Sequence, residues 1–341
     1  MEKNESPNIY DIARAAKVST ATVSRVLGGG QKVSEVTRNK VLAVMEDLGY
    51  VPNAFARGLG LGSMRLVGIL CADVSDSFYA HAVSIIERRL KKRGLNAILY
   101  CTGRALEEKK KGIDILLSKS VDSIILVGSP FVEARDNSHI ANAARYVPVI
   151  CINGLVEDKN IYCVLCDENH AMYENTIHLL DYGCKNILYL YDAETYSGKQ
   201  KKAGLFRAFD ERGISISQEL LVCVERDVGT VTSKVLELLD SGMQIDGALV
   251  SEDILAIGAC KAFAERGLNL PVIGFNNSIL AECATPSLSS VDNMLEPMCN
   301  TAVDTLDNIL NGRTVPQKVI VSARLVERET FKVETSPQGG T

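Results

Sequence analysis

Residues 8–59 read NIYDIARAAKVSTATVSRVLGGGQKVSEVTRNKVLAVMEDLGYVPNAFARGL, and within them apolar residues recur at helical spacing. Asn8 is a good N-cap, and Asp11 stands at the third position of the helix that it begins. The apolar face of this first helix consists of Ile9, Ile12, Ala13 and Ala16. The pattern predicts a short helix that packs on its neighbours through one face.

Two more helices are expected directly after it. Ser19 caps the second helix, whose inward residues are Val23, Val26 and Leu27 and whose outward residues are Thr20, Ala21, Ser24 and Arg25. Ser34 caps the third and Gly49 ends it, with an expected buried stripe of Val41, Leu42, Met45 and Leu48. Two helices joined by a tight turn, the second beginning with short polar side chains, predict a helix-turn-helix, whose second helix fits the DNA major groove.

This stretch closely resembles the lactose/galactose repressor (LacI/GalR) family of bacterial transcription regulators, without a gap from Asn8 to Leu59. The segment VPNAFARGL at 51–59 distinguishes the match from helix-turn-helix domains in general. A looser resemblance continues for most of the remaining chain. The resemblance implies that DNA is contacted by Thr20, Ala21, Thr22, Arg25, Lys32, Asn53, Ala56, Arg57 and Leu59.

The chemistry of the outward residues on the second helix suits base recognition. Arg25 can donate two hydrogen bonds to guanine, worth about 1–3 kcal/mol against a wrong base, while Thr20 and Ala21 offer methyl contacts to thymine. The alternative for Arg25 is a solvated surface charge. The resemblance favours the DNA contact.

Residues 52–59 resemble the hinge helix of the family. So short a helix is unstable alone, so we expect it to fold only on DNA and against a second copy. Leu59 matches the leucine that such hinges insert into the central minor-groove step, and Ala56 lets two hinges approach. Leu59 could instead be a core residue at the edge of the next domain. Gly58 replaces a common Ser, and each Gly inside a helix costs about 1 kcal/mol against Ala.

Composition indicates a soluble globular protein. The chain has 341 residues, of which 46% are hydrophobic and 23% charged. No signal segment and no membrane-length apolar run is evident, so we expect a cytoplasmic, nucleoid-associated protein without a membrane partner. Ten scattered cysteines indicate reduced thiols, mostly buried in strands, and no disulfides.

The net charge of −5 is unevenly distributed. Residues 1–62 contain eight Lys or Arg and six Asp or Glu, a charge of +2, while the remaining 29 basic and 36 acidic residues give −7. Phosphate contacts are expected from Lys17, Lys32, Arg38 and Lys40, together with helix N-termini and backbone amides. Because this excess is small, one copy should bind DNA weakly, and a homodimer is expected.

Beyond residue 62, strands and helices alternate, as in parallel sheets covered on both faces. The first set has expected strands at 66–71, 96–100, 123–127 and 149–152, with helices at 79–93 and 107–119. The second set has expected strands at 187–191, 220–224, 247–250, 272–275 and 288–291, with helices at 169–182, 199–212, 230–241 and 253–266. An apolar-sided helix at 297–310 either joins a dimer or covers a sheet.

The expected fold class is therefore an N-terminal all-α helix-turn-helix domain plus hinge helix, followed by two doubly wound parallel-sheet lobes. The resemblance implies lobes like those of periplasmic sugar-binding proteins, with three crossings near Cys166, Asp292 and Val321. The expected boundaries are 1–50 for the DNA-binding domain, 51–62 for the hinge and linker, 63–333 for the effector and dimer core, and 334–341 for a disordered tail. Within the core, the N-lobe takes about 63–165 and 292–320, and the C-lobe about 166–291 and 321–333.

Ligands of open α/β lobes bind at the carboxyl ends of the strands. The first such loop, 73–79, matches the effector loop of the family, where Phe78 and Tyr79 would face a ring unless they are only core residues. The effector-binding residues implied are Ser75, Phe78, Tyr79, Tyr196, Ser197, Lys201, Asp253 and Asn276.

Several positions depart from sugar-responsive relatives. Lys201 stands where Arg is typical and Asn276 where Asp is typical, Gly154 replaces a frequent Arg and Glu252 a frequent Asn. Lys lacks the planar fork of Arg, and Asn carries no charge. The effector could be an unusual sugar, another small metabolite, or nothing at all, which would leave a ligand-independent or corepressor-dependent regulator.

Two motifs point to other functions. The run GLGLG at 58–62 partly resembles a dinucleotide-binding loop, but it precedes the strand at 66–71 instead of following one, so a dinucleotide-dependent enzyme is a distant alternative. Cys163 and Cys166 have zinc-like or redox-like spacing, but they lie in one expected strand, without a second pair. None of the four histidines sits in a recognisable catalytic motif. We expect no catalysis, no cofactor and no metal.

The sequence thus predicts a sequence-specific transcriptional regulator, most simply a repressor. Its expected partners are double-stranded DNA with a pseudo-palindromic operator, a second copy of itself, and a small effector bound between the two lobes.

Overall fold

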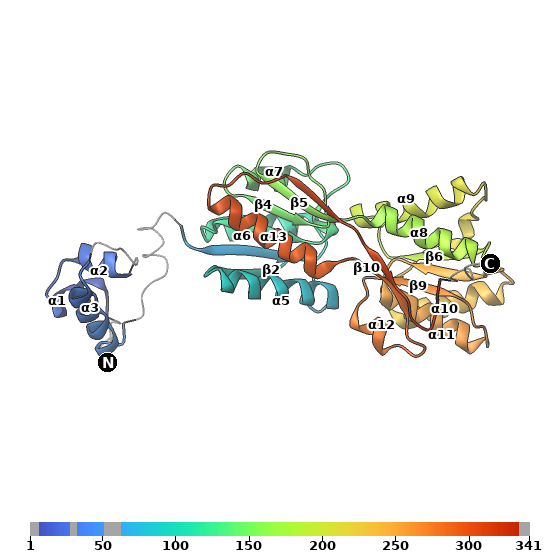
Figure 1. Ribbon diagram of the computed structural model, residues 1–341, viewed down its shortest axis with the longest axis horizontal. Coiled ribbons are helices and arrows are strands. Elements are labelled where there is room, and N and C mark those ends of the chain that lie inside the picture. Colours follow the sequence, from blue (N-terminus) through green and yellow to red (C-terminus); the bar gives the residue numbers. More distant parts are fainter. Residues whose placement is uncertain (1–6, 28–32, 51–62, 334–341) are drawn as a thin grey trace, which may run out of the picture. The chain divides into compact units, whose positions relative to one another are not determined.

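The computed structural model describes residues 7–27, 33–50 and 63–333 (Figure 1). Lys32, the expected hinge at 51–62 and the expected tail at 334–341 lie outside these residues. The chain divides into two compact units, a small N-terminal helical unit and a large α/β unit that begins at Val67.

The helical unit contains the three expected helices, α1 (Ile9–Ala15), α2 (Thr20–Leu27) and α3 (Glu35–Asp47). Their caps form as predicted. The Asn8 side chain accepts from the backbone amides of Tyr10 and Asp11, and Asp11 accepts in return from the Asn8 amide at 3.0 Å, which completes a capping box. The Ser19 hydroxyl accepts from the Thr22 amide at 3.2 Å and so fixes the beginning of α2.

The end of α3 is a Schellman turn, as Gly49 suggests. Gly49 has φ +61°, and the Tyr50 amide donates back to the Met45 carbonyl at 2.8 Å. Val41 and Met45 are buried as predicted, but the prediction for Leu42 and Leu48 is wrong, since they are 47% and 42% exposed. Leu42 is rotated by about 100° from Val41, and Leu48 follows the last turn, where the chain leaves the helix. Val44 and Tyr50 complete the small core instead.

The α/β unit contains two six-stranded sheets (Figure 1). The first, in spatial order, consists of β11 (Lys318–Val321), β5 (Ile161–Cys166), β4 (Val149–Ile152), β3 (Ser123–Val127), β1 (Leu66–Cys71) and β2 (Asn96–Cys101). The pairs from β11 to β1 are parallel. The two faces alternate along β1: Val67 and Ile69 join the core beneath α5 (Ser77–Lys92) and α13 (Leu295–Leu310), whereas Leu70 lies against α6 (Leu106–Ser118).

The second sheet follows the same rule. Its order is β12 (Arg324–Val326), β10 (Ser289–Asp292), β9 (Val272–Phe275), β8 (Gly247–Val250), β6 (Ile187–Tyr191) and β7 (Leu221–Cys223). One face packs on α8 (Glu168–Asp181) and α9 (Tyr196–Glu211), the other on α10 (Val228–Asp240) and α11 (Asp253–Glu265). Its neighbouring strands pair in parallel except β10 with β12, which are antiparallel, unlike the all-parallel sheet predicted.

Several short elements escaped the sequence analysis. They are α7 (Ser138–Ala144), α12 (Ile279–Cys283), the edge strands β11 and β12, and the 3-10 turns η1 (Ser129–Phe131) and η2 (Gln218–Leu220). The chain leaves the first sheet after β5 and again after β11, and it leaves the second after β10. Helix α13 covers the first sheet, since Met298, Ala302 and Leu306 are fully buried in its core.

A close contact between α8 and α9 offers a test of this packing. A Cβ on Gly204 in α9 would overlap the Asn169 carbonyl oxygen of α8 and lie 3.0 Å from the Met172 Cβ. We expect Gly204→Ala to lower the free energy of unfolding by about 1–3 kcal/mol in urea denaturation, because backbone atoms cannot yield locally. Gly229→Ala in α10 is the control, since its Cβ would meet only the Asp227 side chain, at 3.2 Å. Equal effects of the two substitutions would contradict the proposed tight contact.

Candidate functional site

A cleft lies between the two sheets, where the carboxyl ends of the parallel strands meet. Loops after β1, β2, β3 and β4 supply one side, and loops after β6, β7, β8 and β9 supply the other. The cleft contains a small polar cavity of about 60 Å³ and a wider groove of about 1300 Å³. Six residues line both spaces, namely Phe78, Tyr79, Arg104, Arg226, Glu252 and Asn276.

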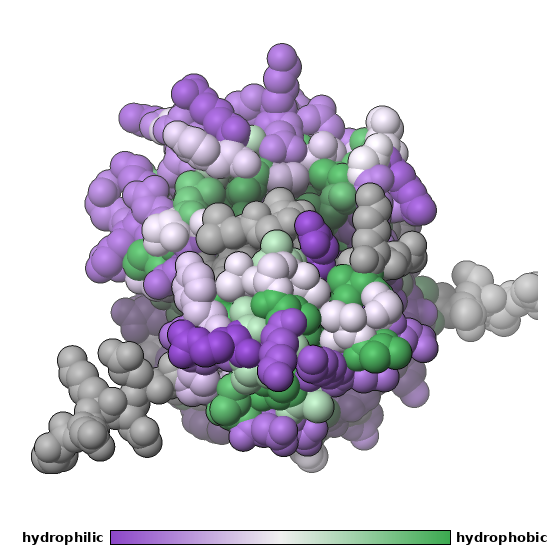
Figure 2. Space-filling model, turned by 90° about the vertical axis from the view of Figure 1, so that its left-hand side faces the viewer, coloured by the Kyte–Doolittle hydropathy of each residue, from purple (hydrophilic) through white to green (hydrophobic). Residues whose placement is uncertain are grey.

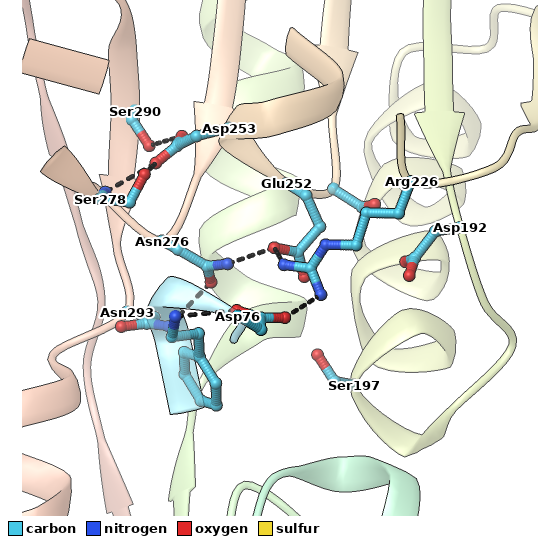
Figure 3. Close-up of polar contacts among 12 residues, drawn as sticks. Asp76, Asp192, Ser197, Arg226, Glu252, Asp253, Asn276, Ser278, Ser290 and Asn293 are labelled. Carbon is cyan, nitrogen blue, oxygen red and sulfur yellow. Dashed lines mark hydrogen bonds and ion pairs between the residues drawn. The ribbon is translucent and has the colours of Figure 1, made fainter. Parts of the chain in front are cut away.

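Arg226 lines both the cavity and the groove, and Figure 3 shows its polar contacts. Its guanidinium donates to Asp76 of the first lobe at 2.5 Å and to Glu252 of the second at 2.9 Å. Asn276 also donates to Glu252, at 2.5 Å, and accepts from Asn293 at 2.8 Å. One arginine thus joins carboxylates from both lobes in a continuous polar network.

Three further contacts cross between the lobes. Arg104 pairs with Asp192 at 3.1 Å, the Ser129 hydroxyl donates to Thr195 at 3.0 Å, and Asn153 donates to Glu168 at 3.0 Å. Each partner follows the carboxyl end of a strand or begins the next helix. The lobes are therefore held together by the protein's own polar side chains, which explains why the inner cavity is small.

The inner cavity is lined by a buried lysine and a buried glutamate. Lys201 is only 3% exposed, and its ammonium donates to the Ser251 carbonyl at 2.9 Å and lies 3.9 Å from the centre of the Phe275 ring. It lies 3.7 Å from Glu168, which also accepts from Ser197 at 2.5 Å. The second carboxylate oxygen of Glu168 and the Ser251 hydroxyl have no hydrogen-bond partner among the described residues. A ligand hydroxyl or amine would satisfy both groups.

Most of the residues expected at the effector site do line the cleft. Phe78, Tyr79, Ser197, Lys201 and Asn276 line the small cavity, while Ser75 and Asp253 line the groove. Tyr196 lines neither space, although it begins α9. Tyr79 also belongs to the hydrophobic core of the first lobe, and its contact with an effector stays a prediction.

The contacts of Asp253 stabilise a loop of the second lobe. Its carboxylate accepts from the amide and hydroxyl of Ser278, both at 2.7 Å, and from the Ser290 hydroxyl at 2.5 Å (Figure 3). All these partners belong to the second lobe. Asp253 therefore fixes the loop that follows β9, beside Asn276.

Arg226, Asp192 and Glu168 are site residues that were not predicted from the sequence, and Glu252 stood out there only as a departure from relatives. All four follow the end of a strand. That position was the available signal, because parallel strands place their carboxyl ends at one edge. Charge pairing across the cleft could not be found in this way, since it depends on how two loops from different lobes meet.

The expected DNA-contacting residues divide between described and undescribed parts of the chain. Ala21 and Arg25 are exposed on α2, and Thr20 and Thr22 are partly exposed. The Thr22 hydroxyl already contacts the Ser19 hydroxyl at 2.9 Å. The other expected contacts lie outside the described residues, namely Lys32, Asn53, Ala56, Arg57 and Leu59.

The surface of the helical unit also carries apolar side chains. Tyr10 and Val36 are exposed on α1 and α3, as are Leu42 and Leu48. On the face that Figure 2 presents, hydrophobic and hydrophilic residues are interspersed. Single exposed apolar residues are common on protein surfaces, so these residues do not by themselves define an interface.

Other kinds of site find no support among the described residues. No group of three or more His, Cys, Asp or Glu there could hold a metal ion, and no helix there is long and apolar enough to cross a membrane. Cys163 and Cys166 are both buried in β5. Six of the ten cysteines are buried, of which Cys71 and Cys151 also lie in strands.

The network around Arg226 predicts a pH dependence of stability. Burial raises the pKa of Glu252 from 4.5 to about 7, although Arg226 and Lys201 oppose this shift. The higher proton affinity of Glu252 in the folded protein stabilises the fold, and this contribution is complete below pH 4.5. It is lost as the pH rises through 7, because between these pH values the folded protein still binds a proton that the unfolded chain has released. From pH 5 to 8 we expect wild type to lose up to about 3 kcal/mol that Glu252→Gln does not lose.

Thermal unfolding of both proteins across this pH range measures the difference. Glu225→Gln is the matched control, because Glu225 is exposed one residue from Arg226, and it should keep the wild-type profile. Identical pH profiles of Glu252→Gln and wild type would contradict the prediction.

Comparisons with known proteins agree with both units of the fold. Residues 8–53 match the model of bacterial regulatory proteins of the lacI family, and residues 176–331 match a periplasmic binding protein-like domain. The chain is 43% identical to an HTH-type transcriptional regulator of Lachnoclostridium phytofermentans, over 95% of this chain and 99% of the relative. It is 31% identical to catabolite control protein A of Priestia megaterium, over 96% and 98%.

A solved structure extends the likeness to the whole fold. The lac repressor dimer bound to operator and the anti-inducer ONPF superposes with a TM-score of 0.84 at 23% identity, covering 96% of this chain and 99% of that chain. The expected fold class is thereby confirmed, apart from the antiparallel edge strand β12. With a helix-turn-helix unit, a two-lobed core and relatives of over 30% identity along nearly its full length, the chain belongs to the lacI family and is a DNA-binding transcriptional regulator.

Proposed function

We propose that this protein is a repressor whose operator affinity is controlled by a small effector bound between the two lobes. The observation that carries the proposal is the pair of unpartnered polar groups, on Glu168 and Ser251, in a cavity lined by both lobes. A ligand there touches both lobes and can therefore change how they pack. It can act on DNA binding only if it binds one lobe arrangement more tightly than the other.

The proposed division of labour follows the chain. Residues 1–50 bind DNA, 51–62 form the hinge, 63–333 bind effector and dimerise, and 334–341 form a tail. As a homodimer, the protein would read a pseudo-palindromic operator with one α2 helix in each half-site. The paired Leu59 side chains would wedge its centre. The protein would act in the cytoplasm at the nucleoid, without catalysis or a cofactor.

The proposed effector is a small polyhydroxylated molecule. Glu168 and Ser251 offer an acceptor and a hydroxyl, Lys201 offers a donor, and Phe78 offers an apolar face beside them. Related solved structures include the regulator CelR with cellobiose, and a regulator from Alkaliphilus metalliredigens with D-xylulofuranose. Their ligands support a sugar or a related metabolite.

A second candidate function is a regulator that needs no effector or that needs a corepressor. The ion pairs of Arg226 and Arg104 already close the cleft, and the inner cavity of about 60 Å³ has room for only a few water molecules. Selection of bound sequences from a random DNA pool, followed by a ligand screen on the selected operator, separates the two. If one sugar weakens or strengthens operator binding, the effector-controlled repressor is supported. If no sugar changes operator binding, the regulator without a sugar effector is supported.

Arg25 tests the DNA-binding half of the proposal. We expect Arg25→Ala to weaken binding to the selected operator by about 1–3 kcal/mol per half-site, measured by fluorescence anisotropy, with little change on random DNA. Arg25→Lys, which keeps the charge but loses the fork, should resemble Arg25→Ala on the operator. An equal loss on operator and random DNA would mean that Arg25 contacts phosphate only.

Glu168 tests the effector half. Glu168→Gln removes the carboxylate charge, of which one oxygen has no hydrogen-bond partner among the described residues, but keeps the shape of the side chain. We expect it to weaken effector affinity about tenfold or more in calorimetry, since hydrogen bonds to charged groups contribute about 1.5–3 kcal/mol. Operator affinity without effector should not change. Glu194→Gln removes an exposed carboxylate nearby and is the control. Unaltered effector affinity in Glu168→Gln would remove Glu168 from the site.

A further inference from the structure

Two thiols meet at the base of the loops that form the first lobe's side of the cleft. Cys71 ends β1 and Cys101 ends the neighbouring strand β2, and their sulfur atoms lie 3.6 Å apart. Cys71 is buried, whereas Cys101 is exposed. The pair thus combines a thiol that solvent can reach with a second thiol in contact behind it.

The strand geometry is compatible with a bond between them. Neighbouring strands lie about 4.7–4.9 Å apart, and a disulfide needs Cα atoms about 4.4–6.8 Å apart and sulfurs about 2.05 Å apart. The Thr102 amide donates to the Cys71 carbonyl at 3.0 Å, which fixes the relative position of the two strand ends. A small rotation of the two side chains would bring the sulfurs together without moving the strands apart.

No other cysteine pair among the described residues combines contact with access. Cys151 and Cys163 lie directly opposite each other on β4 and β5, but both are buried. Cys223 and Cys283 are exposed, but neither contacts another thiol in the described part of the chain. These two arrangements are internal controls, one for contact without access and one for access without contact.

We propose that Cys71 and Cys101 are a modification site, which closes to a reversible intramolecular disulfide when the protein meets a peroxide. The peroxide first oxidises the Cys101 thiol to a sulfenic acid, and hydrogen peroxide itself is reduced to one water. The Cys71 sulfur then attacks the Cys101 sulfur, and the hydroxyl leaves with the Cys71 proton as a second water. Two thiols and one peroxide thus give one disulfide and two waters.

The order of these steps follows from the surroundings of the two sulfurs. Burial, together with Cys101, Asp73 and Asp76, raises the pKa of Cys71 to about 12. Because the thiolate is the form that reacts with a peroxide, and because Cys71 is buried, this thiol reacts little with peroxide from solution. Cys101 is the sulfur that a peroxide reaches. Cys71 therefore acts as the resolving thiol, at contact distance.

The bond would fix a part of the cleft that both lobes use. The loop after Cys71 carries Asp76, which pairs with Arg226, and the loop after Cys101 carries Arg104, which pairs with Asp192. Each loop is only a few residues long, so its strand end sets its position. A disulfide at the base of both loops would make the two loops move together when the lobes separate.

Peptide mapping of the oxidised full chain tests the proposal. Reduced protein is treated with hydrogen peroxide, remaining thiols are blocked with N-ethylmaleimide, and a non-reducing digest is analysed by mass spectrometry. We expect one dominant cross-linked peptide pair containing Cys71 and Cys101, lighter by two hydrogens than the separate peptides. Dithiothreitol should release it, and Cys151 and Cys163 should remain reduced.

Two variants make the result specific. Cys101→Ser should abolish the cross-link and leave Cys71 reduced, whereas Cys283→Ser should cross-link like wild type. Because Cys101 and Cys283 are both exposed, neither change should impair folding. Accumulation of sulfinic acid at Cys101 without a cross-link in wild type would overturn the proposal. So would cross-links spread evenly over the exposed cysteines, or a Cys101 that stays reduced while Cys283 is oxidised.

Discussion

Parallel strand pairing is the constraint on which the site depends. A parallel strand needs a crossover on one face of its sheet before the next strand begins, so the parallel strands of a lobe all deliver their carboxyl ends to the same edge. In this protein the edges of two such sheets face each other across one cleft, and the loops that follow them carry its charged residues. Asp76, Arg104, Asp192, Arg226 and Glu252 are distant in sequence. The topology gathers them at one edge within each lobe, and the packing of the two lobes makes them neighbours across the cleft.

Those charges then determine how the lobes hold together. Taking Arg226 and Glu252 out of water is costly, and their attraction offsets that cost only while both remain paired. Asp76 supplies a second partner from the opposite lobe at 2.5 Å, so separation of the lobes would leave a partly buried guanidinium with one carboxylate. The closed cleft is therefore stabilised by the simultaneous pairing of Arg226 with Asp76 and Glu252. An effector must therefore compete with, or add to, contacts that already exist.

The sequence predicted the framework well and the cleft only in part. Buried strands such as β1, β3 and β8 were found with their exact bounds, because runs of apolar residues end at polar loops on both sides. The short edge strand β12 has no such run, and Leu42 was misplaced because an amphipathic pattern does not say how wide the covered face is.

For the site, residues at strand ends were predictable, and the resemblance pointed to Lys201 and Asn276. The bridging contacts of Arg226 were not predictable, because only the folded lobes show that it pairs with both Asp76 and Glu252.

The hydrogen bond between Asn276 and Glu252 connects the predicted effector contact at Asn276 to the ion pair that closes the cleft. Glu252 accepts hydrogen bonds from both Arg226 and Asn276. A ligand that accepted a hydrogen bond from the Asn276 side-chain amide in place of Glu252 would therefore change the surroundings of the carboxylate that holds Arg226. Asn276 has φ +97°, and its backbone amide donates to the Val291 carbonyl at 2.8 Å, so it cannot easily move to serve both partners. Binding of the proposed effector at Asn276 would therefore be coupled to the Arg226 bridge through one short amide contact. Coupling free energies between sites are typically about 1–3 kcal/mol, which a single charged hydrogen bond is large enough to supply.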